Sequence, residues 1–267
     1  MITRRAADAA RSGVVRQARP LLGTLVEIGV ARARPSSPAD AIDGAAVARE
    51  AIAAAFLRVA QVESSLSRFD PRSSIGRFND AGGGAQIEIG EDARVVLQAA
   101  GELFVASDGL FDISLGSGGD GWSCDGSVLR KLRDGVRLDL GGIAKGHAVD
   151  VAVTALRECG VEDGWVNAGG DLRVFGALAL PIDLRDEELG GVRRFAVLED
   201  GAFATSWIAA PEVTRNLPRS ARAEAARHAS VAAHRCLWAD ALTKIVALAG
   251  DARHPLVAAH YAHAWLH

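Results

Sequence analysis

The chain has 267 residues, of which 49% are hydrophobic and 24% charged, and its formal net charge is −3 at pH 7. These values exclude a disordered, collagen-like or coiled-coil protein, and the balanced charge gives no electrostatic case for binding nucleic acid. All but three of the 30 basic residues are arginine. The lysines are Lys131, in a charged stretch typical of a solvated surface, and Lys145 and Lys244, in segments discussed below.

The N-terminal segment predicts a cytoplasmic protein. The Arg4-Arg5 pair is followed by Asp8 and further arginines instead of the apolar run of a signal peptide. No stretch approaches the eighteen or so apolar residues of a membrane span. The widely spaced cysteines, without a C-x-x-C pair, predict free thiols and neither a disulfide framework nor a zinc site. They are Cys124, Cys159 and Cys236.

In chain order, residues 31–43 are rich in Ala, Pro, Ser and Asp and predict a loop. Apolar residues then recur at helical spacing over about 45–66 and again over 91–106, which predicts two amphipathic helices. Residues 136–140 alternate apolar and charged side chains. This alternation predicts a half-buried strand.

The second half of the chain predicts a helix over 147–158 that ends at Gly160. Two short strands follow over 164–175, around a glycine turn. A last helix is expected over 240–249, ending at Gly250. Because strands and helices alternate without a strict βαβ rhythm, the sequence favours an α+β fold, a mixed sheet and helix sandwich, over a doubly wound fold.

The most informative segment is 138–147, Leu-Asp-Leu-Gly-Gly-Ile-Ala-Lys-Gly-His. Two glycines before a helix bring free backbone N–H groups and the positive end of the helix dipole to a place where a ligand can approach closely. Lys145 opposes that dipole, so its position makes sense if an anion binds nearby. The alternative is a solvated lysine beside an ordinary tight turn.

Two further segments carry polar groups in compact spacing. Residues 167–171, Asn-Ala-Gly-Gly-Asp, form a second glycine turn, although any hairpin could use this sequence. Asp240, Thr243 and Lys244 fall within one helical turn and share a face. Either Asp240 caps the helix and pairs with Lys244, or Asp240 and Thr243 offer oxygen ligands to magnesium.

Together these three segments resemble the ApbE family, the FAD:protein FMN transferases. The resemblance extends from Arg19 to Gly250 and includes Asp-Leu-Gly-Gly-Ile-Ala-Lys-Gly-x-x-x-Asp followed by Asn-Ala-Gly-Gly-Asp. Four shorter segments also match, namely 19–27, 67–79, 109–114 and 204–206. The resemblance implies an α+β sandwich of the ApbE (T-fold-like) type, with an N-terminal tail over 1–18 and a single catalytic, flavin-binding domain over 19–267.

The resemblance also implies an activity. Members of the family bind FAD with a divalent metal, Mg²⁺, cleave its pyrophosphate, and pass FMN to a Ser or Thr hydroxyl of an acceptor flavoprotein, releasing AMP. By position, the FAD site would contain Leu22, Phe69, Leu110, Phe111, Asp112, Asp139, Lys145 and Asn216. The metal would be held by the Gly142 carbonyl and the Asp240 carboxylate, with Thr243 as a further oxygen ligand.

The chain departs from the family pattern at two places. Active members carry His-x-x-Asp-Pro-x-Thr-Gly, with the histidine assisting deprotonation of the acceptor, but Thr214 stands at that position in the nearest candidate segment, 214–221. His228 and His234 are the candidates for a replacement base. Lys244 stands where metal-binding members have Thr, and an ammonium has no lone pair for a metal.

Three functions follow from this combination. The first is a metal-dependent FMN transferase. The second is a non-catalytic FAD-binding protein that keeps the diphosphate-binding segments. The third is an FAD pyrophosphatase that releases FMN and AMP, because water needs less positioning than a protein acceptor.

Overall fold

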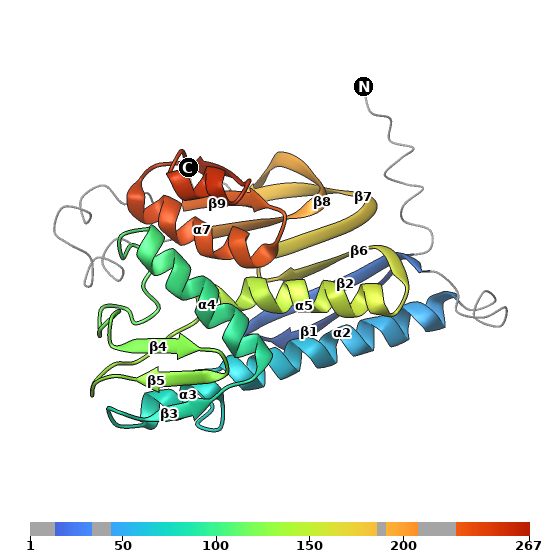
Figure 1. Cartoon of the computed structure of the whole chain (residues 1–267). Coiled ribbons are helices and arrows are strands. Elements are labelled where there is room, and N and C mark those ends of the chain that lie inside the picture. Colours follow the sequence, from blue (N-terminus) through green and yellow to red (C-terminus); the bar gives the residue numbers. More distant parts are fainter. Residues whose placement is uncertain (1–13, 34–43, 186–190, 208–227) are drawn as a thin grey trace.

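The computed structural model describes residues 14–33, 44–185, 191–207 and 228–267. The described residues form an α+β sandwich in which helices cover one face of a seven-stranded antiparallel sheet (Figure 1). In spatial order the sheet contains β1 (Val15–Leu21), β2 (Thr24–Ala33), β6 (Val161–Ala168), β7 (Asp171–Arg185), β8 (Val192–Trp207), β9 (His228–Ala233) and β10 (His263–Leu266). The predicted fold class is confirmed.

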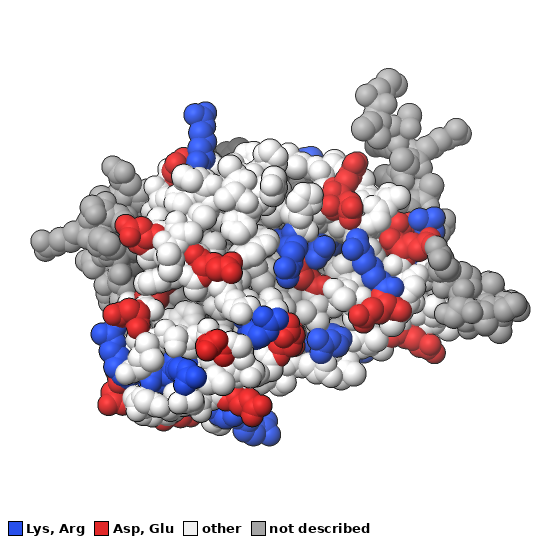
Figure 2. All heavy atoms as spheres, viewed as in Figure 1, with Lys and Arg blue, Asp and Glu red and all other residues white. Residues whose placement is uncertain are grey.

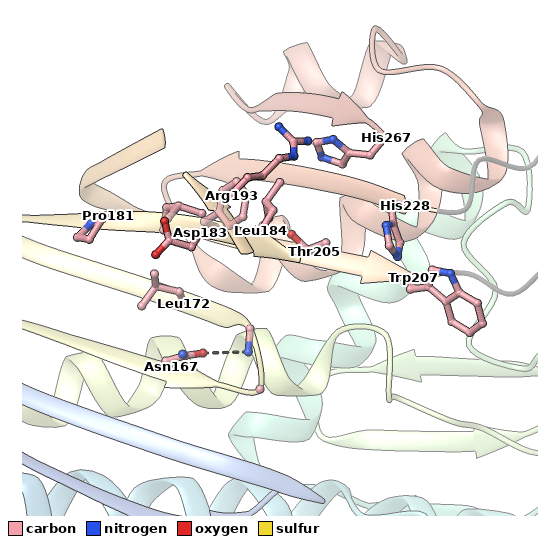
Figure 3. A pocket seen from close by; sticks show the side chains of 14 residues that line it. Asn167, Leu172, Pro181, Asp183, Leu184, Arg193, Thr205, Trp207, His228 and His267 are labelled. Carbon is pink, nitrogen blue, oxygen red and sulfur yellow. Dashed lines mark hydrogen bonds between the residues drawn. The ribbon is translucent and has the colours of Figure 1, made fainter. Parts of the chain in front are cut away.

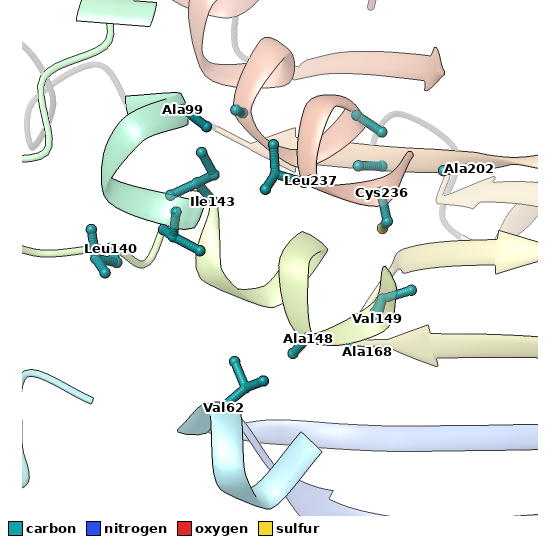
Figure 4. Packing of buried hydrophobic residues seen from close by; sticks show 14 of the residues in the cluster. Val62, Ala99, Leu140, Ile143, Ala148, Val149, Ala168, Ala202, Cys236 and Leu237 are labelled. Carbon is teal, nitrogen blue, oxygen red and sulfur yellow. The ribbon is translucent and has the colours of Figure 1, made fainter. Parts of the chain in front are cut away.

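Three helices lie side by side on this sheet, each over a different pair of strands. They are α2 (Gly44–Leu66) on β1 and β2, α5 (Ala144–Glu158) on β6 and β7, and α7 (Cys236–Ala249) on β8 and β9. Alternate residues of the strands face these helices. Val166, Ala204 and Val231 are among them and are fully buried. Figure 4 shows the core between α5 and α7, with Ala148 and Leu237 among the residues that fill it.

A smaller sheet lies at one end of the molecule, next to the start of α5 (Figure 1). It contains β3 (Gln86–Glu88), β5 (Val128–Lys131) and β4 (Trp122–Asp125), in that order. The helices α3 (Ser74–Asp80) and α4 (Glu91–Ala106) connect it to the rest, and α8 (Pro255–Ala259) precedes β10. None of the described helices is long and apolar enough to cross a membrane.

The predicted helices are confirmed, with corrected starts for the last two. α5 begins at Ala144 and α7 at Cys236, so Asp240 lies one turn inside α7 and does not cap it. Gly250, with φ +65°, ends α7 as predicted. The two strands expected over 164–175 are present as β6 and β7, and both extend beyond that range.

Two sequence predictions are wrong at their boundaries. β1 begins at Val15 and pairs with β2, so the segment 1–18 is not a tail over its whole length. The loop predicted over 31–43 starts too early, because β2 continues to Ala33, while 34–43 lie outside the described residues.

The strand predicted over 136–140 is not formed. Val136, Leu138 and Leu140 are buried, as the alternation indicated, but no neighbouring strand pairs with them among the described residues. The Asn79 side chain takes that place: its Nδ2 donates to Leu138 O at 2.9 Å, and its Oδ1 accepts from Leu138 N at 2.7 Å. An amide side chain therefore satisfies the backbone of Leu138, while Arg137 N donates to Ser117 Oγ and Asp139 N to Ile113 O.

Lys131 is not a solvated residue, because only 3% of it is exposed. Its Nζ donates to the backbone oxygens of Phe78, Asn79 and Ala81 at 3.2, 3.4 and 2.8 Å. These carbonyls lie at the C-terminal end of α3, where a cation also complements the helix dipole. Lys131 thus joins the small sheet to α3.

The outer strands of the seven-stranded sheet are β1 and β10. β1 exposes Arg16, Arg19 and Pro20 along its length. β10 has four residues. Charged side chains, proline and short length are features that natural proteins place on free sheet edges.

α5 and α7 cap each other through two buried aspartates. Asp150 of α5 accepts from the backbone N–H groups of Cys236 and Leu237 at 2.9 and 3.1 Å, at the start of α7. Asp240 of α7 accepts from Gly146 N at 3.1 Å, in the first turn of α5. Because neither helix has a side-chain cap from its own N-cap residue, each supplies the other's missing acceptor.

Replacing Asp150 by alanine is expected to lower the free energy of unfolding by about 3–5 kcal/mol, because it leaves two N–H groups and the half-buried Arg173 guanidinium unpaired. Urea denaturation would measure the change. Asp183→Ala is the matched control, since it breaks an exposed pair with Arg194 (Nε–Oδ1 2.6 Å) and should cost less than about 1 kcal/mol. Equal losses in the two variants would contradict the capping role.

Candidate functional site

Four charged side chains meet where the starts of α5 and β7 approach the middle of α7. Lys145 Nζ lies 3.0 Å from Asp171 Oδ2 and 3.8 Å from Asp240 Oδ2. Lys244 Nζ pairs with Asp240 Oδ1 and also donates to the Asp240 backbone oxygen at 2.9 Å. We call these four residues the charged cluster. It contains two ammonium groups and two carboxyl groups.

Burial and mutual attraction shift the pKa values within the charged cluster. Burial alone would lower the pKa of Lys145, but the charges of Asp240 and Asp171 outweigh it and raise that pKa. Burial and the charge of Asp240 raise the pKa of Asp171 to about 6, against the attraction of Lys145 and Lys244. Burial would raise the pKa of Asp240 as well, yet the two ammonium groups and Gly146 N–H lower it.

The glycine turn before α5 holds the charged cluster at a helix N-terminus. Asp139 Oδ1 accepts from Gly141 N at 2.9 Å, and its Oδ2 lies 3.1 Å from Arg68 Nε. Lys145 Nζ donates to Gly141 O at 3.3 Å. The positive end of α5 and two lysines therefore converge beside one turn, an arrangement suited to an anion.

A cavity of about 390 Å³ opens next to this turn. Four residues predicted for the FAD site line it together: Leu22, Phe69, Asp139 and Lys145. Phe69 is 81% exposed, and the Arg68 guanidinium lies 4.3 Å from the centre of its ring. An aromatic face, an acidic residue and a lysine therefore lie around one cavity.

Leu22 lies in the tight turn between β1 and β2 with φ +57°, a left-handed conformation that disfavours a branched side chain. Its backbone N–H donates to Glu63 Oε1 at 2.9 Å, which holds this turn against α2. Strained residues of this kind occur at ligand sites when the surrounding contacts fix them.

Of the predicted residues 110–112, Leu110 and Phe111 pack against the core, whereas Asp112 hydrogen-bonds within its own loop. Phe111 is buried next to Gly142, whose hypothetical β-carbon would lie 3.6 Å from the Phe111 ring and 3.5 Å from Lys244 Cε. Leu110 is half-buried at the core. The Asp112 carboxylate accepts from Ser114 N and Oγ, both at 2.8 Å, so it organises its own loop.

The two candidate bases lie at either end of β9. His234 is exposed just before α7. His228 lines a second cavity, of about 610 Å³, on the sheet face away from the helices, together with Thr205, Trp207 and His267 (Figure 3). Neither of them lines the cavity beside Lys145. Asn216 and the segment 214–221 lie outside the described residues.

Sequence reasoning singled out the turn that contains Asp171 but missed its ion pair with Lys145. It also missed the pair between His147 Nε2 and Asp92 Oδ1, at 2.9 Å, which joins α5 to the start of α4. The Asn-Ala-Gly-Gly-Asp motif could have indicated the contact between Lys145 and Asp171. No motif indicates the contact between His147 and Asp92, which are 55 positions apart.

The residues expected to hold magnesium do not fit that ion. Lys244, Lys145 and Gly146 N–H surround the two carboxylate oxygens of Asp240. Thr243 is fully buried, and its Oγ1 lies 2.8 Å from Ser206 Oγ and 2.6 Å from the Asp240 carbonyl. No group of three or more His, Cys, Asp or Glu residues within the described ranges could hold a metal. Magnesium requires several free oxygen ligands in octahedral geometry.

Charged residues of both signs are interspersed on the face shown in Figure 2, without a continuous basic surface there. The fold and the site together define an α+β protein in which a helix N-terminus and two lysines lie beside a cavity with an aromatic side chain. The model of the ApbE family matches residues 22–127 and 120–265. The chain therefore belongs to the ApbE family.

Solved structures of this family share the fold. A flavin transferase ApbE from Vibrio cholerae superposes with a TM-score of 0.78 at 19% identity, covering 95% of this chain and 93% of that one. An ApbE protein from Thermotoga maritima superposes with a TM-score of 0.78 at 22% identity, covering 95% of this chain and 94% of that one.

The sequence comparison adds a relative of named activity. An FAD:protein FMN transferase from Rhodobacter capsulatus is 28% identical over 123 residues, which are 35% of this chain and 24% of that protein.

The contact between α5 and α7 requires Gly146, since a β-carbon there would lie 2.3 Å from the Cys236 carbonyl oxygen. Gly146→Ala is expected to lower the free energy of unfolding by about 1–3 kcal/mol through this overlap. Gly101→Ala in α4 is the control, because the nearest atom would be 3.7 Å away and a helical alanine should add about 0.5–1 kcal/mol. Chemical denaturation measures the free energy of unfolding of both variants. An equal increase in the two would contradict the predicted overlap of the added β-carbon with Cys236.

The raised pKa of Asp171 predicts a pH dependence of stability. Its pKa in the folded chain, about 6, lies above its ordinary value of 3.8. Its contribution to the free energy of unfolding is therefore complete below about pH 4 and is lost as the pH rises through 6. Relative to Asp171→Asn, the native chain should lose about 1–3 kcal/mol between about pH 4 and pH 7. Urea denaturation across this range measures the difference; parallel profiles would show that Asp171 titrates normally.

Proposed function

We propose that this chain transfers FMN from FAD to a Ser or Thr hydroxyl of an acceptor flavoprotein and releases AMP. Family membership supports this reaction class. The observation that carries the proposal is that Phe69, Asp139 and Lys145 line one cavity at the start of α5. That cavity offers an aromatic face and, next to it, the cationic side chains needed for a diphosphate.

The side chains have separable roles in this reaction. The exposed ring of Phe69 offers a stacking surface for the flavin. Lys145, Lys244 and the N-terminus of α5 attract the diphosphate and stabilise the charge that grows as its bond breaks. Positioning and electrostatic stabilisation of this kind are the main contributions of a protein to phosphoryl transfer.

In the transfer step the acceptor hydroxyl oxygen forms a bond to the FMN phosphorus. The phosphoanhydride P–O bond breaks, AMP leaves with its electron pair, and the hydroxyl proton passes to a base or to water. His228 and His234 remain the candidates for that base, and Asn216 remains a predicted flavin contact. Leu22, Leu110, Phe111 and Asp112 remain predicted parts of the FAD site.

Magnesium dependence was expected from the resemblance, with Gly142, Asp240 and Thr243 as ligands. The crowded Asp240 carboxylate and the engaged Thr243 hydroxyl count against that part of the expectation. The proposed transfer is therefore derived from this chain's own residues, and no step of it depends on a metal.

The transfer is tested by incubating the chain with FAD, Mg²⁺ and an acceptor domain that carries a flavinylation threonine. Mass spectrometry should show an acceptor heavier by one FMN, with AMP in equal amount. Lys145→Met should reduce the rate at least about 100-fold, the size of a lost electrostatic contact to the transition state. An acceptor with Thr→Val controls for the modified residue.

The same assay separates the alternatives. AMP release without an adduct would identify an FAD pyrophosphatase. Bound but intact FAD would identify a non-catalytic flavin-binding protein. Replacing His228 and His234 singly would show whether either acts as the base, through a loss of rate that is larger at low pH than at high pH.

A further inference from the structure

We propose that the ammonium of Lys244 takes the place of a divalent cation in this chain, so that the site binds the FAD diphosphate without a metal. The cation replacement follows from the contacts of Lys244 and Asp240. The identity of the diphosphate rests on the proposed function.

The first argument is that both carboxylate oxygens of Asp240 already have a cationic or N–H partner. Its Oδ1 pairs with Lys244 Nζ. Its Oδ2 accepts from Gly146 N at 3.1 Å and lies 3.8 Å from Lys145 Nζ. Because the Gly146 contact also caps α5, rotating the Asp240 carboxylate away from it would leave a buried helix N–H group without an acceptor.

The second argument is the position of Lys244 itself. Its Nζ donates to the Asp240 carbonyl at 2.9 Å, and its Cε lies 3.5 Å from the point where a β-carbon of Gly142 would be. The ammonium is thus held at Asp240 and the end of its carbon chain lies beside Gly142, the two residues that were expected to hold magnesium. About 21% of the Lys244 side chain remains exposed. Lys244 does not line the cavity beside Lys145, so in this proposal it meets the diphosphate at the edge of that cavity.

The third argument concerns charge. Lys145 already pairs with both Asp171 and Asp240, so it balances only part of their negative charge. Lys244 brings the charged cluster to neutrality, and the N-terminus of α5 adds a partial positive charge. A compact ammonium differs from a planar guanidinium, and lysine stands here in a chain whose basic residues are mostly arginine.

Direct metal binding is the first test, and it needs no flavin. Mn²⁺ is titrated into the full chain, and its free signal is followed by electron paramagnetic resonance. We expect no uptake by the native chain. Lys244→Thr removes the ammonium and supplies a hydroxyl oxygen, so this variant should take up one Mn²⁺. Stoichiometric uptake by the native chain would overturn the proposal, whatever the variant does.

FAD affinity is the second readout, measured by quenching of flavin fluorescence in EDTA and in Mg²⁺. The native chain should bind FAD with dissociation constants that agree within about twofold in the two buffers. Lys244→Thr should bind at least about tenfold more weakly in EDTA, the value of one charge-assisted hydrogen bond, and should recover in Mg²⁺. Tenfold tighter native binding in Mg²⁺ than in EDTA would refute the replacement.

Lys244→Met is the matched control, because it removes the charge without adding an oxygen ligand. It should lose affinity for FAD and regain none with Mg²⁺, while circular dichroism confirms that it folds. If the native chain binds FAD in neither buffer, the proposed function fails. The Mn²⁺ titration still decides the replacement in that case, since it involves no flavin.

Discussion

The mutual capping of α5 and α7 fixes the rest of the site. Asp150 and Asp240 each accept from backbone N–H groups of the other helix, and a glycine at 146 lets the helices approach closely enough for this. Both carboxylates are buried, so each must keep its partners. The distance between Lys145 and Lys244 follows from this arrangement, because both lysines lie within five residues of a capping aspartate.

Sequence periodicity predicted the helices well because each buries a long apolar face. It gave a wrong strand over 136–140, since alternation reports which side chains are buried and not what pairs with the backbone; there the partner is the Asn79 amide. It also placed the start of α7 too late. The cap of that helix comes from Asp150, 86 residues earlier, and no local pattern reveals so distant an acceptor.

The site was partly predictable for a different reason. Glycine turns and the spacing of Asp240 and Lys244 pointed to the segments that meet at the charged cluster. The resemblance added Leu22 and Phe69, which line the cavity beside Lys145. The roles of single atoms were not predictable. Thr243 faces Ser206 inside the core, and Asp240 serves as helix cap and ion-pair partner at once. A substitution at Asp240 would therefore remove a helix cap and a charge together. A substitution at Lys244 removes a charge and leaves the helix cap in place.

The two outer strands of the large sheet also affect how copies of the chain behave at high concentration. β1 presents two arginines and a proline that lacks an N–H donor, and β10 offers four residues. A second molecule adding to β1 would meet like charges and a missing hydrogen bond, and one adding to β10 would gain little pairing. Both edges of the large sheet thus carry features that disfavour growth of the sheet from molecule to molecule.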